Sequence, residues 1–401
     1  MPSRPSHLAH VAVIGAGAFG GWTALWLRRR GCRVTLVDAW GAGNSRSSSG
    51  GESRVIRGLY GPDRIYIDWV VRSFALWLES EARWGVRLYN PTGVLWMFSG
   101  DDGYARAALP YLETAGLPVA ELGPQEAARR FPQIDFAGIR SVFHEEKAGW
   151  LAARRACRAV VAALVAEGGE VRLGAVRPGA IRAGNLERLD LADGGTLAAD
   201  AYVFACGPWL GSLFPAVIGD AVLPTRQEVY FFGTPAGDPR FQEGGLPVWL
   251  ELGEHGYYGI PGNDHRGFKI ADDTRGAPID PTAADRSATP ELLARARHYI
   301  GRRFPALAGA PLVEARVCQY ENSPDGHFLI DRHPEAGNAW LVGGGSGHGF
   351  KLGPAVGEHA AALVLGEAAP LPQFALARLG AKDASRRTQF NTAIEAIGTA
   401  G

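Results

Sequence analysis

The chain is poor in cysteine, and its cysteines are widely separated. Only four occur among 401 residues and none forms a C-x-x-C pair; they are Cys32, Cys157, Cys206 and Cys318. This spacing suggests neither a disulfide framework nor a zinc site. We therefore expect no metal, and each cysteine is interpreted by default as a small buried apolar residue.

The chain also lacks net charge and long apolar runs. Lys and Arg together number 41, and Asp and Glu also number 41, so no overall field attracts nucleic acid or an anionic membrane. No apolar run reaches the roughly 18 residues of a membrane-spanning helix, and residues 1–7 lack the apolar core of a signal peptide. We expect a soluble cytoplasmic protein with small-molecule partners and no nucleic-acid or membrane partner.

Glycine, in contrast, is abundant, and two glycine-rich segments lie near the two ends of the chain, at residues 15–20 and 343–351. The first contains Gly15, Gly17 and Gly20, after an apolar run at residues 10–14 and before a helical pattern. A buried strand, a glycine turn and a helix in this order form the dinucleotide fingerprint, because the helix N-terminus points free N–H groups at a pyrophosphate.

A second predicted strand, at residues 33–37, ends in Asp38. A carboxylate at this place accepts a hydrogen bond from a ribose hydroxyl and would repel a 2′-phosphate. The combined pattern predicts a dinucleotide site, and it does not distinguish NAD from FAD.

Between the two glycine-rich segments, helix-rich and strand-rich stretches alternate. Helices are expected near residues 65–81, 124–130 and 153–167, and strands near residues 93–98, 171–173, 201–205, 228–232 and 255–260. We predict an α/β fold in which a Rossmann-like nucleotide-binding domain is interleaved with a sheet-rich α+β cap, with the ligand pocket between them. The nucleotide-binding domain takes residues 1–87, 144–222 and 313–401, and the cap takes residues 88–143 and 223–312.

A loop rich in serine and glycine, at residues 43–53, leads into Arg54 and Arg57. Such a loop is by default a low-complexity linker. The two arginines, however, lie three residues apart and would share one face of a helix. We therefore interpret the segment as the edge of a site.

Six motifs together resemble a known family. They lie at residues 15–20, 53–57, 205–209, 316–320, 323–331 and 346–351. In this order they resemble the monomeric sarcosine oxidase family of FAD amine oxidases, which includes N-methyltryptophan oxidase and pipecolate oxidase and falls in the D-amino-acid-oxidase class. The similarity spans nearly the whole chain, and it implies an FAD-binding domain, a substrate-binding cap and a monomeric protein.

The resemblance implies that FAD is bound and that Cys318 is bonded through its sulfur to the flavin. Without the resemblance, this residue would be interpreted as an ordinary buried thiol. A covalent tether raises the reduction potential of the ring and prevents loss of the cofactor. Arg54 is expected to support the flavin or to orient Arg57. The second glycine segment adds the implied cofactor contacts Gly347, His348, Gly349 and Lys351.

The resemblance also assigns the residues for oxygen and substrate. Lys269 matches the lysine that activates oxygen, since a fixed cation stabilises the anion formed when dioxygen accepts an electron; a solvated surface lysine is the alternative. Arg57 and Lys351 match the two cations that hold the substrate carboxylate, with a structural salt bridge as the alternative for Arg57. Tyr258 and Tyr320 match tyrosines of the substrate pocket.

Two positions depart from the family pattern. Gly50 and Asp273 stand where sarcosine oxidase has histidines. We expect Gly50 to enlarge the space near the flavin, and Asp273 to place an anion in the pocket unless Arg266 or another cation neutralises it. Sarcosine itself is therefore in doubt as the substrate, and a larger amino acid is expected.

The predicted function is that of an FAD-dependent oxidase of a secondary amine, N-methyl or cyclic, that carries a carboxylate. The C–N bond is oxidised to an imine, and oxygen is reduced to hydrogen peroxide. The alternatives are an FAD amine dehydrogenase, a deglycating oxidase of the fructosyl amino acid type, and a flavoprotein without turnover.

Overall fold

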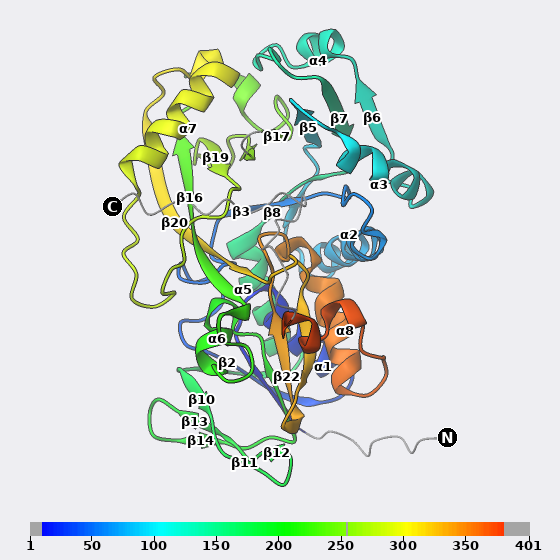
Figure 1. Ribbon diagram of the computed structural model, residues 1–401, viewed down its shortest axis with the longest axis vertical. Coiled ribbons are helices and arrows are strands. Elements are labelled where there is room, and N and C mark those ends of the chain that lie inside the picture. The colour runs from blue at the N-terminus through cyan, green and yellow to red at the C-terminus, as the bar shows by residue number, and fades with distance from the viewer. Residues whose placement is uncertain (1–9, 254–255, 381–401) are drawn as a thin grey trace.

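The computed structural model describes residues 10–253 and 256–380. Two large sheets lie one above the other in Figure 1, each with helices packed against it. A smaller sheet lies between them, and two short ones lie at the lower end of the molecule.

The lower sheet has six strands in the order β21-β22-β15-β1-β2-β9, and only the edge strand β21 runs antiparallel to its neighbour. These strands are β1 (His10–Ile14), β2 (Arg33–Asp38), β9 (Glu170–Leu173), β15 (Ala201–Phe204), β21 (Leu329–His333) and β22 (Ala336–Gly343). A mostly parallel sheet with a glycine turn after its first strand is the predicted Rossmann-like arrangement.

Strand β1 is apolar throughout because both of its faces are buried. Val11 and Val13 pack into one core with helix α1 (Ala18–Arg29), whereas Ala12 and Ile14 pack into a second core. A strand that is covered on both faces needs such a continuous apolar run. The helices that pack here are α1, α2 (Arg64–Trp84), α5 (Ala153–Ala166) and α8 (Gly353–Val364).

The upper sheet has eight strands in the order β20-β16-β19-β18-β17-β5-β7-β6, and only the pair β17 and β5 is parallel. These strands are β5 (Val94–Phe98), β6 (Val119–Leu122), β7 (Ser141–Glu145), β16 (Leu223–Phe232), β17 (Val248–Leu252), β18 (Tyr257–Ile260), β19 (Phe268–Asp272) and β20 (Leu312–Asn322). Helix α7 (Pro290–Arg303) covers this sheet (Figure 1), and its Tyr299 and Ile300 share a core with Trp249 and Phe268.

Short elements complete the described chain. Strand β8 (Gly149–Ala152) joins β3 (Ser53–Ile56) to β4 (Tyr89–Asn90) in the middle sheet. The short sheets at the lower end contain β10 (Val176–Pro178), β13 (Leu189–Leu191) and β14 (Thr196–Leu197), and β11 (Ile181–Arg182) and β12 (Asn185–Leu186). The remaining helices of more than one turn are α3 (Gly103–Thr114), α4 (Pro124–Arg130) and α6 (Leu210–Leu213).

The helices predicted near residues 65–81, 124–130 and 153–167 are confirmed as α2, α4 and α5. One other expectation is wrong. Arg54 lies in strand β3, so it does not share a helix face with Arg57. Strand β20 belongs to the upper sheet through its long pairing with β16, and the predicted domain boundary at residue 313 falls within this strand.

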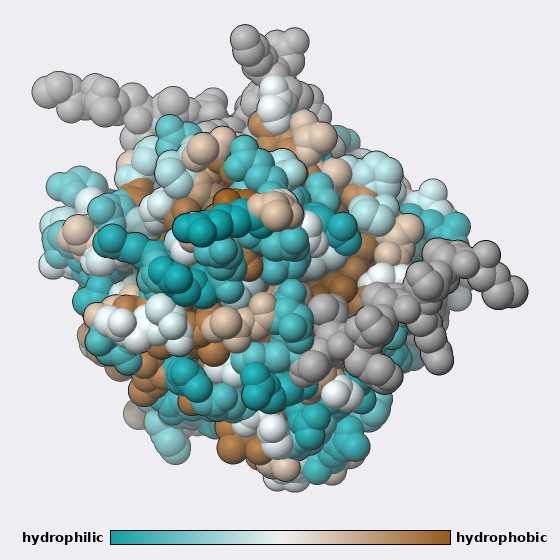
Figure 2. Space-filling view, turned by 90° about the horizontal axis from the view of Figure 1, so that it is seen from below, coloured by the Kyte–Doolittle hydropathy of each residue, from teal (hydrophilic) through white to brown (hydrophobic). Residues whose placement is uncertain are grey.

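Seen from below, the molecule presents polar residues over most of its face, with smaller apolar patches between them (Figure 2). Within the described ranges, no helix has both the length and the apolar character needed to cross a membrane.

The first turn of helix α1 packs so closely on the glycine turn before it that no side chain fits at Gly20. A Cβ there would lie 1.9 Å from the carbonyl oxygen of Gly15. We predict that Gly20→Ala lowers the free energy of unfolding by roughly 1–3 kcal/mol, the usual cost of overpacking. Urea unfolding measures the change. Gly123→Ala is the control, because a Cβ at Gly123 would meet no atom within 4 Å; equal losses in both variants would contradict the prediction.

Candidate cofactor and substrate site

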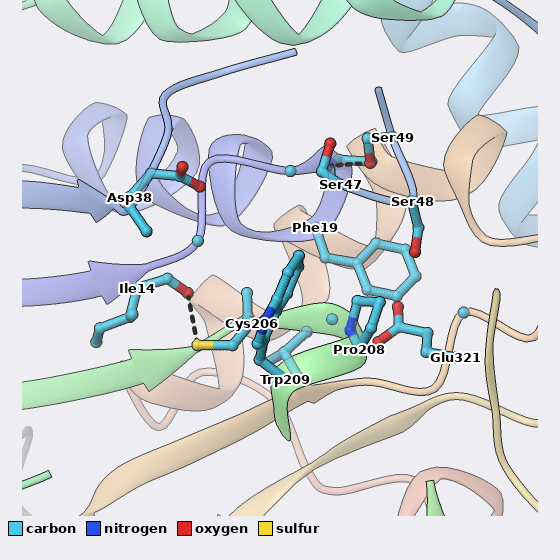
Figure 3. A pocket seen from close by; sticks show the side chains of 18 of the residues that line it. Ile14, Phe19, Asp38, Ser47, Ser48, Ser49, Cys206, Pro208, Trp209 and Glu321 are labelled. Atoms are coloured by element: carbon cyan, nitrogen blue, oxygen red, sulfur yellow. Dashed lines mark hydrogen bonds between the residues drawn. The ribbon is translucent and has the colours of Figure 1, made fainter. Parts of the chain in front are cut away.

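An open cavity lies at the carboxyl ends of the parallel strands. Its walls come from the segments that follow β1, β2, β15 and β22, together with Ser47, Ser48 and Ser49 of the serine-rich loop. Figure 3 shows side chains from these segments arranged around it. Open α/β sheets bind ligands at this edge, and the loop lies at the edge of a site, as predicted. We call this the main cavity.

The glycine turn after β1 presents bare backbone to the main cavity. Gly15 has φ 104°, and a Cβ there would lie 2.3 Å from the carbonyl oxygen of Ala205, so the turn and the end of β15 touch. A Cβ at Gly17 would meet only Ser49 Oγ, at 3.4 Å. Gly17 is also the N-cap of α1, and the first turn of that helix contains no acidic residue. This combination of a bare turn and a helix N-terminus suits a diphosphate.

Asp38 lines the main cavity and also shapes the turn around it. Its Oδ1 accepts from the N–H groups of Trp40 and Gly41 at 2.8 and 2.7 Å, and its Oδ2 accepts from the N–H of Ala16 at 2.7 Å. Each carboxylate oxygen accepts two hydrogen bonds, so Oδ2 keeps one position for a ribose hydroxyl.

A second cavity adjoins the main one and contains the residues that the resemblance assigns to the flavin ring and to oxygen. Lys269, Cys318 and Tyr258 line it, and Arg54 and Tyr320 line both cavities. The Nη2 atom of Arg54 lies 3.6 Å from Cys318 Sγ. The structure therefore brings together five predicted residues from β3, β18, β19 and β20.

Lys269 is not a solvated surface residue. Its side chain is 2 % exposed, and its Nζ donates to the carbonyl oxygen of Ser53 at 2.9 Å. Burial, and then the charge of Arg54, lower its pKa to about 7. Burial also raises the pKa of the neighbouring Tyr258 to about 12. The second cavity thus holds a lysine that titrates near neutral pH beside a tyrosine that stays protonated.

The charged groups of Arg57 and Lys351 both lie against the ring of Tyr60. The guanidinium carbon of Arg57 lies 4.4 Å from the ring centroid, and Lys351 Nζ lies 5.0 Å from it. Lys351 Nζ donates to the carbonyl oxygen of His348 at 2.9 Å. Burial, and then the charge of Arg57, hold the pKa of Lys351 well below its usual range. Neither cation is among the residues that line the two cavities.

The second glycine segment has two roles. Gly347 and Gly349 line the main cavity, where a Cβ would lie 2.9 Å from Tyr320 Cε2 and 2.6 Å from Phe19 Cζ, respectively. The ring of His348 does not line it. That ring interacts with the carbonyl oxygen of Gly326 through Nε2 at 2.9 Å, and burial and then Lys351 hold its pKa well below the usual value. His348 therefore braces the segment instead of facing the main cavity.

The structure places both departures from the family pattern near the second cavity. Gly50 lines this cavity, and a Cβ there would lie 1.9 Å from the carbonyl oxygen of Asn44, so the backbone of the serine-rich loop occupies the position of a side chain. Asp273 accepts from the hydroxyl of Tyr320 at 2.9 Å and lies 3.8 Å from Arg275 Nη1. Arg275 neutralises this anion, which removes the reason to expect a cationic substrate.

Sequence reasoning missed three residues of this region. Arg275 is buried and donates to the carbonyl oxygen of Ser346 at 2.7 Å, which ties the cap to the second glycine segment. Trp209 and Glu321 line the main cavity. Trp209 lies in one of the motifs that carry the family resemblance. Glu321 directly follows the predicted site residue Tyr320, and Arg275 lies two residues after Asp273. This proximity in the sequence was the only signal for either residue.

The residues present fit an FAD. The main cavity offers a bare helix N-terminus for a diphosphate and a carboxylate oxygen for a ribose hydroxyl, and the second cavity adjoins it. Among the residues that the structure describes, no group of three or more His, Cys, Asp or Glu side chains is placed to hold a metal ion.

Comparison with known proteins agrees with this geometry. The family model described as "FAD dependent oxidoreductase" matches residues 10–363. Monomeric sarcosine oxidase of Arthrobacter sp. (strain TE1826) is 30% identical over 354 residues, which cover 87% of this chain and 90% of that protein. N-methyl-L-tryptophan oxidase of Yersinia pestis (strain Pestoides F) is 26% identical and covers 91% of this chain and 98% of its own length.

Solved structures share the fold. L-proline dehydrogenase from P. horikoshii superimposes with a TM-score of 0.81 at 21% identity, over 93% of this chain and 98% of that one. A mutant of Amadoriase I from Aspergillus fumigatus gives a TM-score of 0.83 at 22% identity, over 98% of this chain and 95% of that one. Because the family model covers nearly the whole described chain, the protein belongs to the FAD dependent oxidoreductase family.

Proposed function

We propose that this protein is an oxidase of secondary-amine amino acids, N-methyl or cyclic, that produces an imine and hydrogen peroxide. The observation that carries the proposal is the buried Lys269, which shares the second cavity with Cys318 and Tyr258. Relatives of similar length, named as oxidases of sarcosine and of N-methyl-L-tryptophan, support the substrate class. FAD, when bound, accepts two electrons from the amine and passes them to dioxygen.

The side chains of the site have separate tasks in this scheme. Lys269 holds a positive charge where dioxygen is reduced, and a fixed charge in a water-poor site costs no reorganisation during the reaction. Arg57 and Lys351 bind the substrate carboxylate, which orients the C–H bond to be broken. Tyr258 and Tyr320 form the wall against which the substrate packs.

An amine dehydrogenase and a deglycating oxidase are the alternatives, because L-proline dehydrogenase and Amadoriase I have the same fold. A dehydrogenase needs no cation for oxygen, so Lys269 favours an oxidase. Peroxide release with N-methyl, cyclic and fructosyl amino acids tests the proposal directly. Turnover that requires an artificial electron acceptor would identify a dehydrogenase, and turnover of fructosyl amino acids alone would identify a deglycating enzyme. No turnover with any of them would favour a flavoprotein that only binds.

Cys318 is proposed to hold the flavin covalently. We predict that the flavin of the native protein stays with the polypeptide after acid denaturation, whereas Cys318→Ser releases it. Cys206→Ser is the control, because Cys206 lines the adjoining main cavity, where burial raises its pKa and keeps it an unreactive thiol. Absorbance of the precipitate and of the supernatant measures the result. Release of all flavin from the native protein would refute the attachment.

Lys269 gives the oxygen reaction a dependence on charge and on pH. We predict that Lys269→Met slows reoxidation of the reduced protein about 10²–10³-fold, with a much smaller effect on reduction by substrate. Since the pKa of Lys269 is about 7, its positive charge is lost as the pH rises through that value, and native reoxidation should slow above it. Stopped-flow measurement of reduction by substrate and of reoxidation by oxygen tests both predictions. Equal slowing of both would mean that Lys269 only shapes the cavity.

Arg57 and Lys351 are proposed to bind the carboxylate because both are buried beside Tyr60, and Lys351 directly follows Phe350, which lines the main cavity. Arg57→Ala should weaken a carboxylate inhibitor by roughly 2–4 kcal/mol, the cost of leaving a buried charge unpaired. Arg57→Lys, which keeps the charge, should lose less. Unchanged inhibitor binding in Arg57→Ala would place the anion site elsewhere.

Lys351 should make the affinity for a carboxylate inhibitor depend on pH. Its pKa is depressed, and a bound carboxylate favours its charged form, so binding takes up a proton. The affinity for the inhibitor should therefore fall as the pH rises, and Lys351→Met should remove that part of the dependence.

A further inference from the structure

Glu321 is a buried acid on the wall of the main cavity that the proposed reaction does not use. It lies on β20, three residues beyond Cys318, and its side chain is 8 % exposed. Figure 3 shows it near Phe19 and Pro208, both of which line the same cavity. Its Oε2 atom is buried and has no hydrogen-bond partner. A buried oxygen of this kind requires an explanation, because a lost partner costs free energy.

The surroundings of this carboxyl group are built from glycine. A Cβ at Gly207 or at Gly343 would lie 3.4 Å from Oε2, and a Cβ at Gly345 would lie 3.1 Å from Oε1. The three glycines come from two segments far apart in the chain, one after β15 and one at the end of β22, and Gly207 and Gly345 also line the main cavity. The backbone N–H groups of Gly344 and Gly345 act against burial and lower the pKa of the carboxyl group. Oε2 is therefore enclosed by bare backbone, while the residue as a whole lines the cavity that takes the cofactor.

No cation balances this acid. Among the residues that the structure describes, no lysine, arginine or histidine forms an ion pair with Glu321. In the segment after β15, the titratable group that interacts with Glu321 is the thiol of Cys206. Burial, and then the charges of Asp38 and Glu321, raise the pKa of this thiol. The neighbours from α1 and from β22 are apolar or glycine. Burial raises the pKa of Glu321 to about 7, and a dianionic diphosphate in the main cavity would favour the neutral acid further.

We propose that Glu321 is protonated when FAD occupies the main cavity and that its carboxyl group donates a hydrogen bond to an acceptor oxygen of the diphosphate and ribityl segment. The position of Glu321 favours this part of the cofactor as the acceptor, because the residue lies between the helix N-terminus that suits the diphosphate and the second cavity that contains Cys318. A neutral acid donates to a ligand atom, whereas a carboxylate there would face the negative charge of the diphosphate without a cation.

The consequence is a dependence of FAD binding on pH. Below about pH 7 the free protein already carries the proton, so the affinity is constant. Above that value binding takes up a proton, and the affinity falls by up to about tenfold per pH unit until the higher pKa of the bound form is reached. Lys269 also titrates near this pH, so only the difference between the native residue and a variant at position 321 is diagnostic.

The test measures the dissociation constant of FAD by equilibrium dialysis of the loaded full-length chain between pH 6 and pH 9. It uses the Cys318→Ser background, or the unaltered chain if its flavin is not covalent. Glu321→Gln keeps a donor but cannot ionise, so it should match the parent at pH 6 and lose less affinity at pH 9. Glu321→Ala lacks the donor and should bind FAD more weakly at both values. Glu314→Gln, the same exchange on the same strand beside Arg316, is the control and should behave as the parent.

Two results would overturn the proposal. In the first, the FAD affinity of Glu321→Gln depends on pH as strongly as that of the parent. In the second, the FAD affinity of the parent rises with pH more than that of Glu321→Gln. If Glu321→Ala does not fold, the comparison of the Gln variant with the parent still decides. The proposal rests on FAD binding alone, so the absence of amine oxidation would refute the proposed function and leave this inference standing.

Discussion

Strand β20 is the constraint on which the site depends, because it belongs to the upper sheet and yet supplies residues to both cavities. Its pairing with β16 continues from Asn322 to Leu312, so the cap sets its position. Successive side chains of a strand point to opposite faces. Cys318 and Tyr320 therefore share one face and both line the second cavity, where Tyr320 also reaches the main cavity, while Glu321 is on the other face and lines the main cavity alone. A register shift of one residue would exchange these faces and remove Cys318 from Lys269.

Buried positive charge is the second feature that organises the site. Lys269 lies near Arg54 and Lys351 lies near Arg57, and in each pair burial and the neighbouring cation lower the pKa of the lysine. Buried cations of this kind cost free energy unless anions accompany them. In the proposed function, a carboxylate substrate would provide such an anion at Arg57 and Lys351. Such a ligand would be part of the charge balance of the folded protein, and its binding would stabilise the fold by mass action.

The parts of the structure that were predictable from the sequence depend on residues close together in the chain. The turn at Gly15 and Gly17, the carboxylate of Asp38 and helix α5 each follow from a local pattern of apolar residues, glycine and charge. The expectation that Arg54 and Arg57 share a helix face used a local rule as well, and it failed. Pairing of β3 with β8, about one hundred residues away, overrides a short local pattern.

The remaining features depend on contacts between distant segments, which no spacing rule connects. The negative charge of Asp273 is balanced by the neighbouring Arg275. The position that a side chain would take at Gly50 is occupied by the carbonyl oxygen of Asn44. Glu321 is the clearest case. A single acid in a strand is normally a solvated residue, and here it is buried only because segments after β15 and β22 meet around it with no side chains of their own. Its protonation is therefore a property of the assembled cavity, and the occupant of that cavity decides whether the charge is present.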